Sequence, residues 1–289
     1  MESDQPLQDK ICLITGGTSG IGLETAVGIA KQGAIVSITG HEAKRGEKAR
    51  REISERSDNS NIEFMLCDLA SQADVNRFLL EFGQRYWQLN ILVLNAAIIT
   101  RHREESVEGI EKQFAVNHLS QFLLVRQLLD RLITGAPARI VAVTSDGHKH
   151  GRLNFADYLQ SATNYRPLHT HFQSKLANIM CAFAFAKEYE NIGVTVNCVY
   201  PGRAKTNLLQ EMPLWVQTTS WVTAVSAQKA AESVIYLATS PDIADISGQY
   251  YEKKEATRAA EQAYDEAAQQ KLYKLCLELT NIRKDTIPE

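Results

Sequence analysis

The amino-acid sequence predicts an α/β fold, a doubly wound and mostly parallel seven-stranded sheet with helices on both faces. Short apolar runs rich in β-branched residues alternate with longer segments of helical periodicity. The short runs are apolar almost throughout, as expected of parallel strands that are covered on both faces. The first run leads directly into a glycine-rich turn and then a helix, and such strand–helix alternation is typical of a parallel sheet with right-handed crossovers.

Seven segments are predicted to be strands. They are Lys10–Thr15, Ala34–Thr39, Ile62–Cys67, Asn90–Asn95, Arg139–Ser145, Val194–Val199 and Gly248–Tyr251. Helical periodicity marks six segments between them: Ile21–Lys31, Ala43–Glu55, Ala73–Tyr86, Ile110–Leu132, Thr170–Glu190 and Ala227–Thr239. A C-terminal amphipathic helix is expected at about residues 256–282, packed against the core.

No linker, repeat or low-complexity tract divides the chain, so one domain is expected over residues 1–289. Two long connections interrupt the regular pattern, at Asp146–Pro167 and at about residues 207–221. Connections of this length in a compact domain are usually functional. The second connection is rich in Leu, Met and Trp, and it is predicted to be a lid over a substrate.

Bulk composition excludes several function classes. The net charge of −3 gives no general attraction to nucleic acid, and no run of about 18 apolar residues predicts a membrane span. The cysteines are Cys12, Cys67, Cys181, Cys198 and Cys276. Most lie inside apolar runs, and no pair has a metal or redox spacing, which favours a reduced cytoplasmic protein without a metal site.

The glycine-rich turn after the first strand predicts a dinucleotide-binding site. Glycines allow the tight turn and let backbone N–H groups approach a pyrophosphate, whose charge sits at the N-terminus of the following helix. The predicted contacts are Gly16, Thr18, Ser19, Gly20, Ile21 and Gly22. A strand before this turn, a helix after it and a second strand beyond make the pattern more specific than glycines alone.

The same turn resembles the TGxxxGxG pattern of the short-chain dehydrogenase/reductases, matched at Thr15, Gly16, Gly20 and Gly22. Further matches follow in the order of that family over most of the chain. They are Asp68-Leu69, Asn95-Ala96-Ala97 (with Ala97 in place of a Gly), Asn117, Ser145, Lys175, and Pro201-Gly202 with Thr206. The tail, including Ser247–Tyr251, is similar to the retinol-dehydrogenase-like branch. The resemblance implies a Rossmann fold.

The resemblance also implies an activity and residue roles. The activity is NAD(P)-dependent hydride transfer between nicotinamide and a substrate carbon. Asn117 would support a proton relay, Ser145 would orient the substrate, and Lys175 would grip the nicotinamide ribose. The cofactor contacts implied by the resemblance are Asp68, Leu69, Asn95, Ala96, Ala97, Lys175, Pro201, Gly202 and Thr206.

The residues after the second strand favour NADP(H) over NAD(H). NAD-preferring relatives place an Asp where this chain has Gly40, and a carboxylate there would repel a 2′-phosphate. NADP-preferring relatives often place an Arg where this chain has His41. A histidine can donate a hydrogen bond to the phosphate, although a neutral imidazole is a weaker partner than a guanidinium. The alternative is that His41 is only a turn residue.

One catalytic position departs from the family pattern. The family places a Tyr four residues before its Lys, so that both side chains lie on one helix face. Here Lys175 is preceded by His171. Imidazole has a suitable ordinary pKa, but Lys175 and an oxidised nicotinamide would lower it, so His171 is expected to accept a proton more readily than to donate one. The catalytic set predicted is Asn117, Ser145, His171 and Lys175.

Three interpretations of His171 stay open. In the first, His171 is the acid/base of an oxidoreductase. In the second, it belongs to a redox-neutral isomerase, cyclase or dehydratase. In the third, it inactivates the site, whether the residue is natural or introduced. Tyr165 lies ten residues before Lys175, and nothing in the sequence places its hydroxyl in the pocket. Asp146, directly after Ser145, would orient a substrate hydroxyl, pair with a histidine, or simply face water.

The predicted lid indicates the class of substrate. Its apolar residues, Leu208, Leu209, Met212, Leu214, Trp215 and Trp221, would line a pocket for a bulky or elongated molecule, although some would only pack the lid against the body. A lipophilic alcohol, ketone or aldehyde is therefore expected, without nucleic-acid partners or a membrane span. The family commonly self-associates, so a monomer, homodimer and tetramer all stay open.

Overall fold

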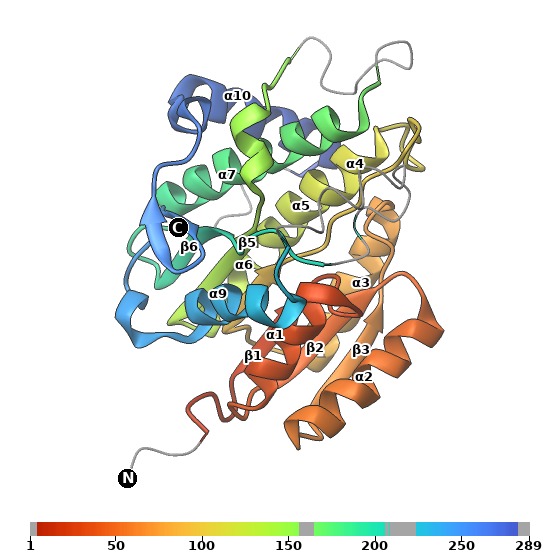
Figure 1. Cartoon of the computed structure of the whole chain (residues 1–289), viewed down its shortest axis with the longest axis vertical. Coiled ribbons are helices and arrows are strands. Elements are labelled where there is room, and N and C mark those ends of the chain that lie inside the picture. The colour runs from red at the N-terminus through yellow and green to blue at the C-terminus, as the bar shows by residue number, and fades with distance from the viewer. Residues whose placement is uncertain (1–4, 156–164, 206–207, 209–223, 283–289) are drawn as a thin grey trace.

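The computed structural model describes residues 5–155, 165–205, 208 and 224–282. Its sheet has the strand order β3-β2-β1-β4-β5-β6-β7-β8 (Figure 1). The strands are β1 (Ile11–Ile14), β2 (Ile35–Gly40), β3 (Ile62–Leu66), β4 (Ile91–Leu94), β5 (Ala138–Val143), β6 (Val194–Tyr200), β7 (Tyr250–Glu252) and β8 (Glu255–Thr257). The doubly wound fold is therefore confirmed, but the described sheet has eight strands rather than the seven predicted.

The additional strand, β8, is antiparallel to β7, whereas β1 to β7 pair in parallel. Its three residues are all exposed. A short exposed strand carries no apolar pattern, because only its pairing with β7 makes it a strand. This is the reason why the sequence did not predict it.

The longer helices cover both faces of the sheet. They are α1 (Gly20–Ala30), α2 (Ala43–Ser57), α3 (Gln72–Arg85), α5 (Ser120–Gln127), α6 (Leu129–Thr134), α7 (Pro167–Glu188), α9 (Ala227–Thr239) and α10 (Glu266–Thr280). One core cluster includes Val27 of α1, Ile53 of α2 and Val234 of α9. The other includes residues of α3, α5, α7 and α10. Successive residues of β1 alternate between the two clusters, which explains why the strands are apolar on both faces.

Two predicted helices were wrong in extent. Ile110–Leu132 is divided into α4 (Lys112–Phe114), a π-helix η1 (Ala115–Leu119), α5 and the first part of α6. The predicted helix over residues 256–282 begins only at Glu266, after β8 and a short 3₁₀ turn, η6 (Glu261–Tyr264). Asp265 caps α10 by accepting a hydrogen bond from the Ala268 N–H. Two further 3₁₀ turns are η2 (Asp146–His150) and η5 (Pro241–Ile243).

Predicted loops lie partly outside the described residues. Thr206 lies outside them, as does the predicted lid over residues 207–221 except for Leu208. Just before and after that segment, Lys205 N–H donates to the Val225 carbonyl and Val225 N–H donates to the Arg203 carbonyl. The backbone on the two sides of the predicted lid is therefore held together at its base.

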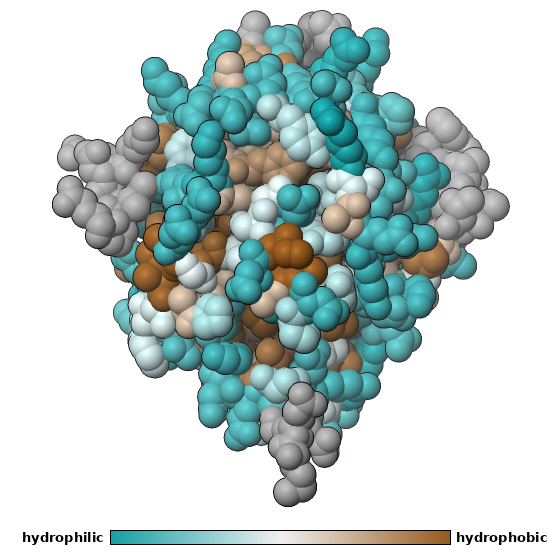
Figure 2. Space-filling model, turned by 90° about the vertical axis from the view of Figure 1, so that its left-hand side faces the viewer, coloured by the Kyte–Doolittle hydropathy of each residue, from teal (hydrophilic) through white to brown (hydrophobic). Residues whose placement is uncertain are grey.

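The outer surface is mixed in character. The face in Figure 2 is largely hydrophilic, with apolar residues gathered around its middle. No helix among the described residues has the length and apolar character needed to cross a bilayer.

Candidate active site

The predicted phosphate-binding turn joins the end of β1 directly to the N-terminus of α1. Gly16 and Gly20 have φ of +65° and +57°, a backbone region that favours glycine. The Ser19 side chain caps no backbone N–H, and the first turn of α1 has no acidic residue. The first N–H groups of α1 have no partner within the helix itself, so they are available to a pyrophosphate.

Asn95, at the end of β4, ties this turn to the next strand. Its side-chain amide donates to the carbonyls of Thr15 and Gly16, at 2.9 and 3.2 Å. The Thr15 hydroxyl in turn accepts hydrogen bonds from the N–H groups of Asn95 and Ala96. The carboxyl ends of β1 and β4 therefore form one rigid unit, and this edge is where ligands bind in open α/β sheets.

The residues predicted to contact the adenosine lie at the ends of β2 and β3. His41 is exposed. A Cβ built on Gly40 would lie 2.6 Å from Thr18 Cγ2, so a larger residue there would require the Thr18 side chain to move. One Asp68 carboxylate oxygen accepts from Ala70 N–H at 2.9 Å.

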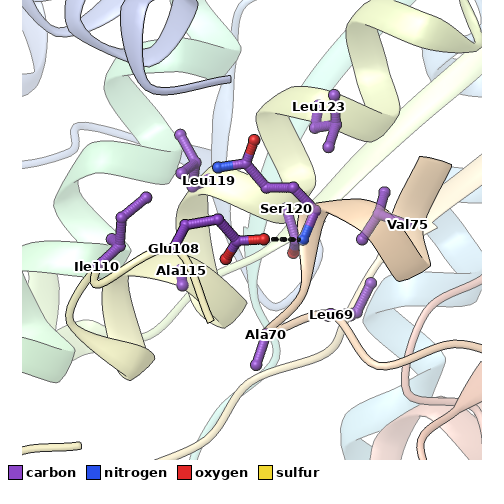
Figure 3. Close-up of a pocket in the computed structure, with 10 residues that line it drawn as sticks. Leu69, Ala70, Val75, Glu108, Ile110, Ala115, Leu119, Ser120 and Leu123 are labelled. Atoms are coloured by element: carbon purple, nitrogen blue, oxygen red, sulfur yellow. Dashed lines mark hydrogen bonds between the residues drawn. The ribbon is translucent and has the colours of Figure 1, made fainter. Parts of the chain in front are cut away.

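The nearby pocket in Figure 3 is not the cofactor cleft. Leu69 and Val75 line it, and Glu108 accepts a hydrogen bond from Gln72 N–H at 2.8 Å beside it. Its cavity is only about 10 Å³. A volume of that size holds at most one water molecule.

The predicted catalytic residues meet where η1, β5 and α7 approach one another. Asn117 Nδ2 lies 3.5 Å from His171 Nδ1, and Lys175 lies one turn further along α7 from His171. All three side chains are buried. Lys175 Nζ donates to the Val143 carbonyl at 3.1 Å. An ammonium has three donors, so this bond leaves two for a ligand.

Both the side-chain amide and the backbone carbonyl of Asn117 are hydrogen-bonded. Its amide oxygen accepts from Ile98 N–H at 2.7 Å, and its Nδ2 donates to the Ile98 carbonyl at 3.0 Å. Its backbone carbonyl accepts from Asn178 Nδ2 at 2.9 Å. A π-helical turn such as η1 changes the regular helical bonding at this point, and such turns are frequent at functional sites.

The environment of His171 keeps the imidazole neutral. Burial and the positive charge of Lys175 lower the pKa of His171 to about 3, against the opposing effect of a hydrogen bond with the Ile98 backbone. Burial also lowers the pKa of Lys175 to about 8. Near neutral pH, His171 is therefore uncharged, and its basicity is well below that of an ordinary imidazole.

Ser145 lies just after the end of β5. Its buried Oγ has no hydrogen-bond partner among the described residues. Buried polar groups normally have partners, so an unpartnered hydroxyl at a predicted substrate position fits a group completed by a ligand. His148 Nδ1 lies 2.6 Å from the Ser145 carbonyl, which holds this turn in place.

Two residues considered at the sequence level have other partners. The Tyr165 hydroxyl contacts Thr100 Oγ1 at 2.7 Å, Gln113 Nε2 at 2.6 Å and Glu111 at 3.2 Å, and burial raises its pKa to about 12. Tyr165 therefore does not replace the missing tyrosine. Asp146 is partly exposed and pairs with Arg203 at 3.4 Å, so it links the turn after β5 to the segment after Pro201-Gly202.

Sequence reasoning missed two residues that support this site. The Ser174 hydroxyl accepts from Asn117 Nδ2 at 3.1 Å and donates to the His171 carbonyl at 2.7 Å. Asn178 binds the backbone of Asn117. Both residues follow His171 at helical spacings of three and seven, and this was the available signal.

A phosphate-binding turn beside a buried polar group at the carboxyl edge of the sheet defines a dinucleotide-dependent oxidoreductase. Residues 10–217 match the family model for short chain dehydrogenases. The chain therefore belongs to the short-chain dehydrogenase/reductase family. It is an oxidoreductase of that type, and the fold implies an NAD(P) cofactor.

The chain is similar to curated proteins over almost its whole length. It is 31% identical to human polyprenol dehydrogenase, over 98% of this chain and 88% of that protein. It is 35% identical to human retinol dehydrogenase 14, over 92% of this chain and 85% of that protein. These relatives support a retinol-dehydrogenase-like member of the family.

Solved structures share the fold. The Pseudomonas aeruginosa RhlG/NADP active-site complex has a TM-score of 0.70 at 26% identity, over 87% of this chain and 97% of that chain. A protein from Mycobacterium paratuberculosis has a TM-score of 0.77 at 24% identity, over 95% of this chain and 96% of that chain. The second likeness supports the fold alone.

Proposed function

We propose that this chain is an NADP(H)-linked dehydrogenase that oxidises a lipophilic alcohol to its ketone or aldehyde, with His171 as the general base. The observation that carries the proposal is the position of a buried, neutral His171 between Asn117 and Lys175. A neutral imidazole in that position can accept the hydroxyl proton of an alcohol.

The proton step follows from the surroundings of His171. A ring N–H that donates to the Ile98 backbone leaves the other ring nitrogen as the proton acceptor. The Ser145 hydroxyl would donate a hydrogen bond to the substrate oxygen as that oxygen loses its proton. When bound, the nicotinamide would take the hydride from the substrate carbon, and Lys175 and the turn between β1 and α1 would hold the cofactor.

Carbonyl reduction by the same site requires the imidazolium form. Burial and Lys175 both disfavour that form, so the group that must donate the proton is scarce at neutral pH. Oxidation starts from the neutral imidazole, which is the form present at neutral pH, and the imidazolium that it leaves must pass its proton on to water. The named relatives are dehydrogenases, so the proposed direction is oxidation of the alcohol. A redox-neutral isomerase, cyclase or dehydratase and an impaired cofactor-binding protein are the competing functions that the experiment below distinguishes.

The preference for NADP(H) rests on the end of β2. Gly40 stands where NAD-preferring relatives carry a carboxylate, so no negative charge at this position repels a 2′-phosphate. His41 is exposed, and α2 begins two residues later, at Ala43. A helix N-terminus favours a phosphate group. Lys44 and Arg45 in the first turn of α2 add positive charge.

The substrate class rests on the named relatives and on the composition of the predicted lid. Retinol and polyprenols are lipophilic alcohols, and the segment 207–221 carries the Leu, Met and Trp residues that would cover such a molecule. We further propose one domain over residues 1–289 in the cytoplasm, as a monomer, homodimer or tetramer. All five cysteines are free thiols, in keeping with a reducing compartment.

The experiment compares the wild-type chain with His171→Tyr and His171→Ala. Lipophilic alcohols with NADP⁺ or NAD⁺ are supplied in one series, and the matching carbonyls with NADPH or NADH in another, while reduced-nicotinamide absorbance is followed. His169→Tyr, two residues away on the same helix, is the matched control. The wild type and the control should oxidise the alcohol, and His171→Ala should lose turnover with nearly intact cofactor affinity.

Two outcomes would contradict the proposal. An unchanged rate in His171→Ala excludes the acid/base role of His171. Turnover by His171→Tyr alone indicates an inactivated site or a redox-neutral enzyme, and product formation without any change in nicotinamide absorbance identifies the latter.

A further inference from the structure

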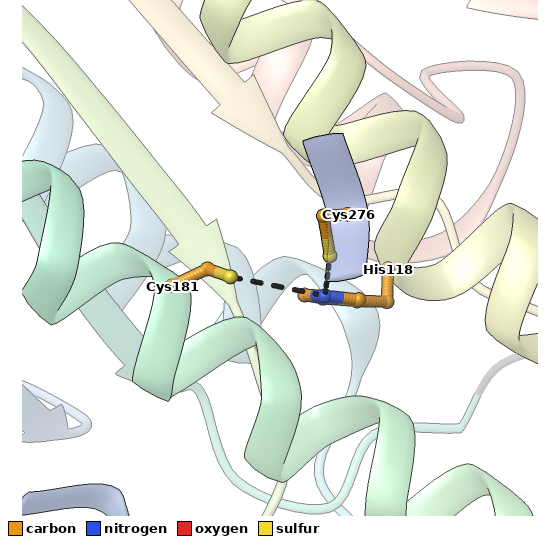
Figure 4. A group of neighbouring side chains, drawn as sticks. All are labelled: His118, Cys181 and Cys276. Carbon is orange, nitrogen blue, oxygen red and sulfur yellow. Dashed lines mark hydrogen bonds between the residues drawn. The ribbon is translucent and has the colours of Figure 1, made fainter. Parts of the chain in front are cut away.

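Three soft metal ligands converge in the protein interior, away from the predicted phosphate-binding turn. His118 of η1, Cys181 of α7 and Cys276 of α10 lie together, with their ligand atoms all within 4.8 Å of one another (Figure 4). His118 Nε2 lies 3.3 Å from Cys276 Sγ and 3.8 Å from Cys181 Sγ. In a tetrahedral zinc site with the usual bond lengths, nitrogen–sulfur and sulfur–sulfur separations are about 3.6–3.8 Å. The two nitrogen–sulfur distances therefore lie on either side of the value in a zinc site.

The ring of His118 is oriented for this role. His118 Nδ1 lies 2.8 Å from the Asn178 amide oxygen. The oxygen can only accept, so Nδ1 carries the proton and Nε2 presents its lone pair to the two sulfurs. Metal-binding histidines are commonly fixed in this way by an oxygen on the other ring nitrogen.

Both thiols approach the single lone pair of Nε2, the two thiols also hydrogen-bond to each other, and all three residues are buried. One divalent cation between them would bind all three atoms at once. Two thiolates and a neutral imidazole balance a charge of +2, so the bound cluster would carry no net charge into the apolar core.

A small cavity adjoins the cluster on one side. His118, Asn178, Cys181 and Gln121 contribute to its lining, and its volume is about 20 Å³. One water molecule needs roughly 10–15 Å³ of such space. There is accordingly room for a water molecule as a fourth ligand, the number that zinc normally takes.

We propose that His118, Cys181 and Cys276 bind a zinc ion that ties α10 to α7 and η1. Thiolate and imidazole ligands select zinc over calcium or magnesium, which prefer oxygen ligands. The site joins the C-terminal helix to the helix that carries His171 and Lys175. This goes against the sequence-level expectation of no metal, which rested on short spacings. Cys181 and Cys276 lie 63 and 158 residues after His118 along the chain.

Metal titration of the full chain tests the site. The protein is stripped with a chelator under reducing conditions, and Zn²⁺ is added in competition with a chromogenic indicator. The wild type, Cys181→Ser, Cys276→Ser and the matched control Cys12→Ser are compared. Cys12 is equally buried, in the core on the opposite face of the sheet. Wild type and control should bind one Zn²⁺, and the two ligand variants should bind at least about 100-fold more weakly, because losing a ligand costs more than losing an outer partner does.

Spectroscopy of the unmutated chain gives a test that does not depend on how the variants fold. Co²⁺ in place of Zn²⁺ should produce a thiolate-to-metal charge-transfer band at one equivalent, and Zn²⁺ should abolish the band. Absence of stoichiometric binding, or equal binding in all four proteins, overturns the proposal. The proposal is also overturned if no metal binds and the mass of the chain falls by two hydrogens because Cys181 and Cys276 form a disulfide. That result would identify a redox pair.

Discussion

The Asn117 amide and the His171 imidazole lie 3.5 Å apart although 54 residues separate them in the sequence. The contact is the longest that the amide makes, because Ile98 and Ser174 take its two N–H groups at 3.0 and 3.1 Å. Asn117 therefore fixes the surroundings of His171 more than it bonds to the ring. The Ser174 hydroxyl closes the connection by donating to the His171 carbonyl.

Removing the Ser174 hydroxyl should disturb catalysis without disturbing cofactor binding. In Ser174→Ala, Asn117 Nδ2 loses an acceptor in the buried site. We expect kcat to fall about fivefold, in line with one hydrogen bond of roughly 1 kcal/mol, while the cofactor Kd stays unchanged. Ser233→Ala, which changes a buried serine of α9, is the control. Equal loss of kcat in both variants would indicate a general effect on folding.

The unfolding free energy should depend on pH through His171. The unfolded chain binds a proton on this residue below its ordinary pKa of 6.5, whereas the folded chain does so only near 3. Stability from this group is present above pH 6.5 and is lost on acidification, by about 1.4 kcal/mol per pH unit between those values. Denaturant unfolding at several pH values measures the slope.

The His171→Asn variant isolates this contribution. His148 also has a lowered pKa, because it is buried, and it adds to the slope in both proteins. The slope between about pH 4 and 6 should therefore decrease in His171→Asn but persist in part. His102→Asn, at an exposed histidine, should leave it unchanged. A variant with the full wild-type slope would contradict the neutral state assigned to His171.

Gly22 should be required for the phosphate-binding turn. A Cβ at this position would lie 2.5 Å from both the Gly16 carbonyl oxygen and Asn95 Nδ2. Gly22→Ala should cost about 1–3 kcal/mol of stability by overpacking, and the displaced turn should weaken cofactor binding at least about tenfold. Thermal unfolding and cofactor titration measure the two effects.

Gly28→Ala is the matched control in the same helix. The new Cβ meets the terminal carbon of Ile235, a side-chain end that can rotate away. Cofactor affinity should stay near that of the wild type. If the two variants bound the cofactor equally well, the close approach at Gly22 would have no role in cofactor binding.

Replacing His41 with arginine should strengthen the preference for NADP(H). A guanidinium adds a permanent charge and paired donors for the 2′-phosphate. The ratio of kcat/KM for NADP⁺ to that for NAD⁺ should rise about tenfold, equivalent to roughly 1.4 kcal/mol. His102→Arg adds the same charge at another exposed histidine and should change the ratio little. An unchanged ratio in His41→Arg would mean that His41 does not face the ribose.

The sequence by itself determined the fold class, the positions of the parallel strands along the chain and the family, because these depend on local patterns. Buried parallel strands read as continuous apolar runs, and a turn such as Gly16–Gly22 can be recognised from spacing alone. Spacing likewise placed His171 and Lys175 one helical turn apart. The strand β8 and the start of α10 were missed, since neighbouring elements rather than local pattern decide them.

Only the tertiary structure decided what surrounds each group. The low pKa of His171 comes from complete burial beside Lys175. The hydrogen bonds of Tyr165 with Glu111 and Gln113 depend on how the segment before α7 is placed. His118, Cys181 and Cys276 meet because η1, α7 and α10 pack together. Burial and contacts between distant residues depend on the packing of whole elements, and short-range sequence patterns do not encode that packing.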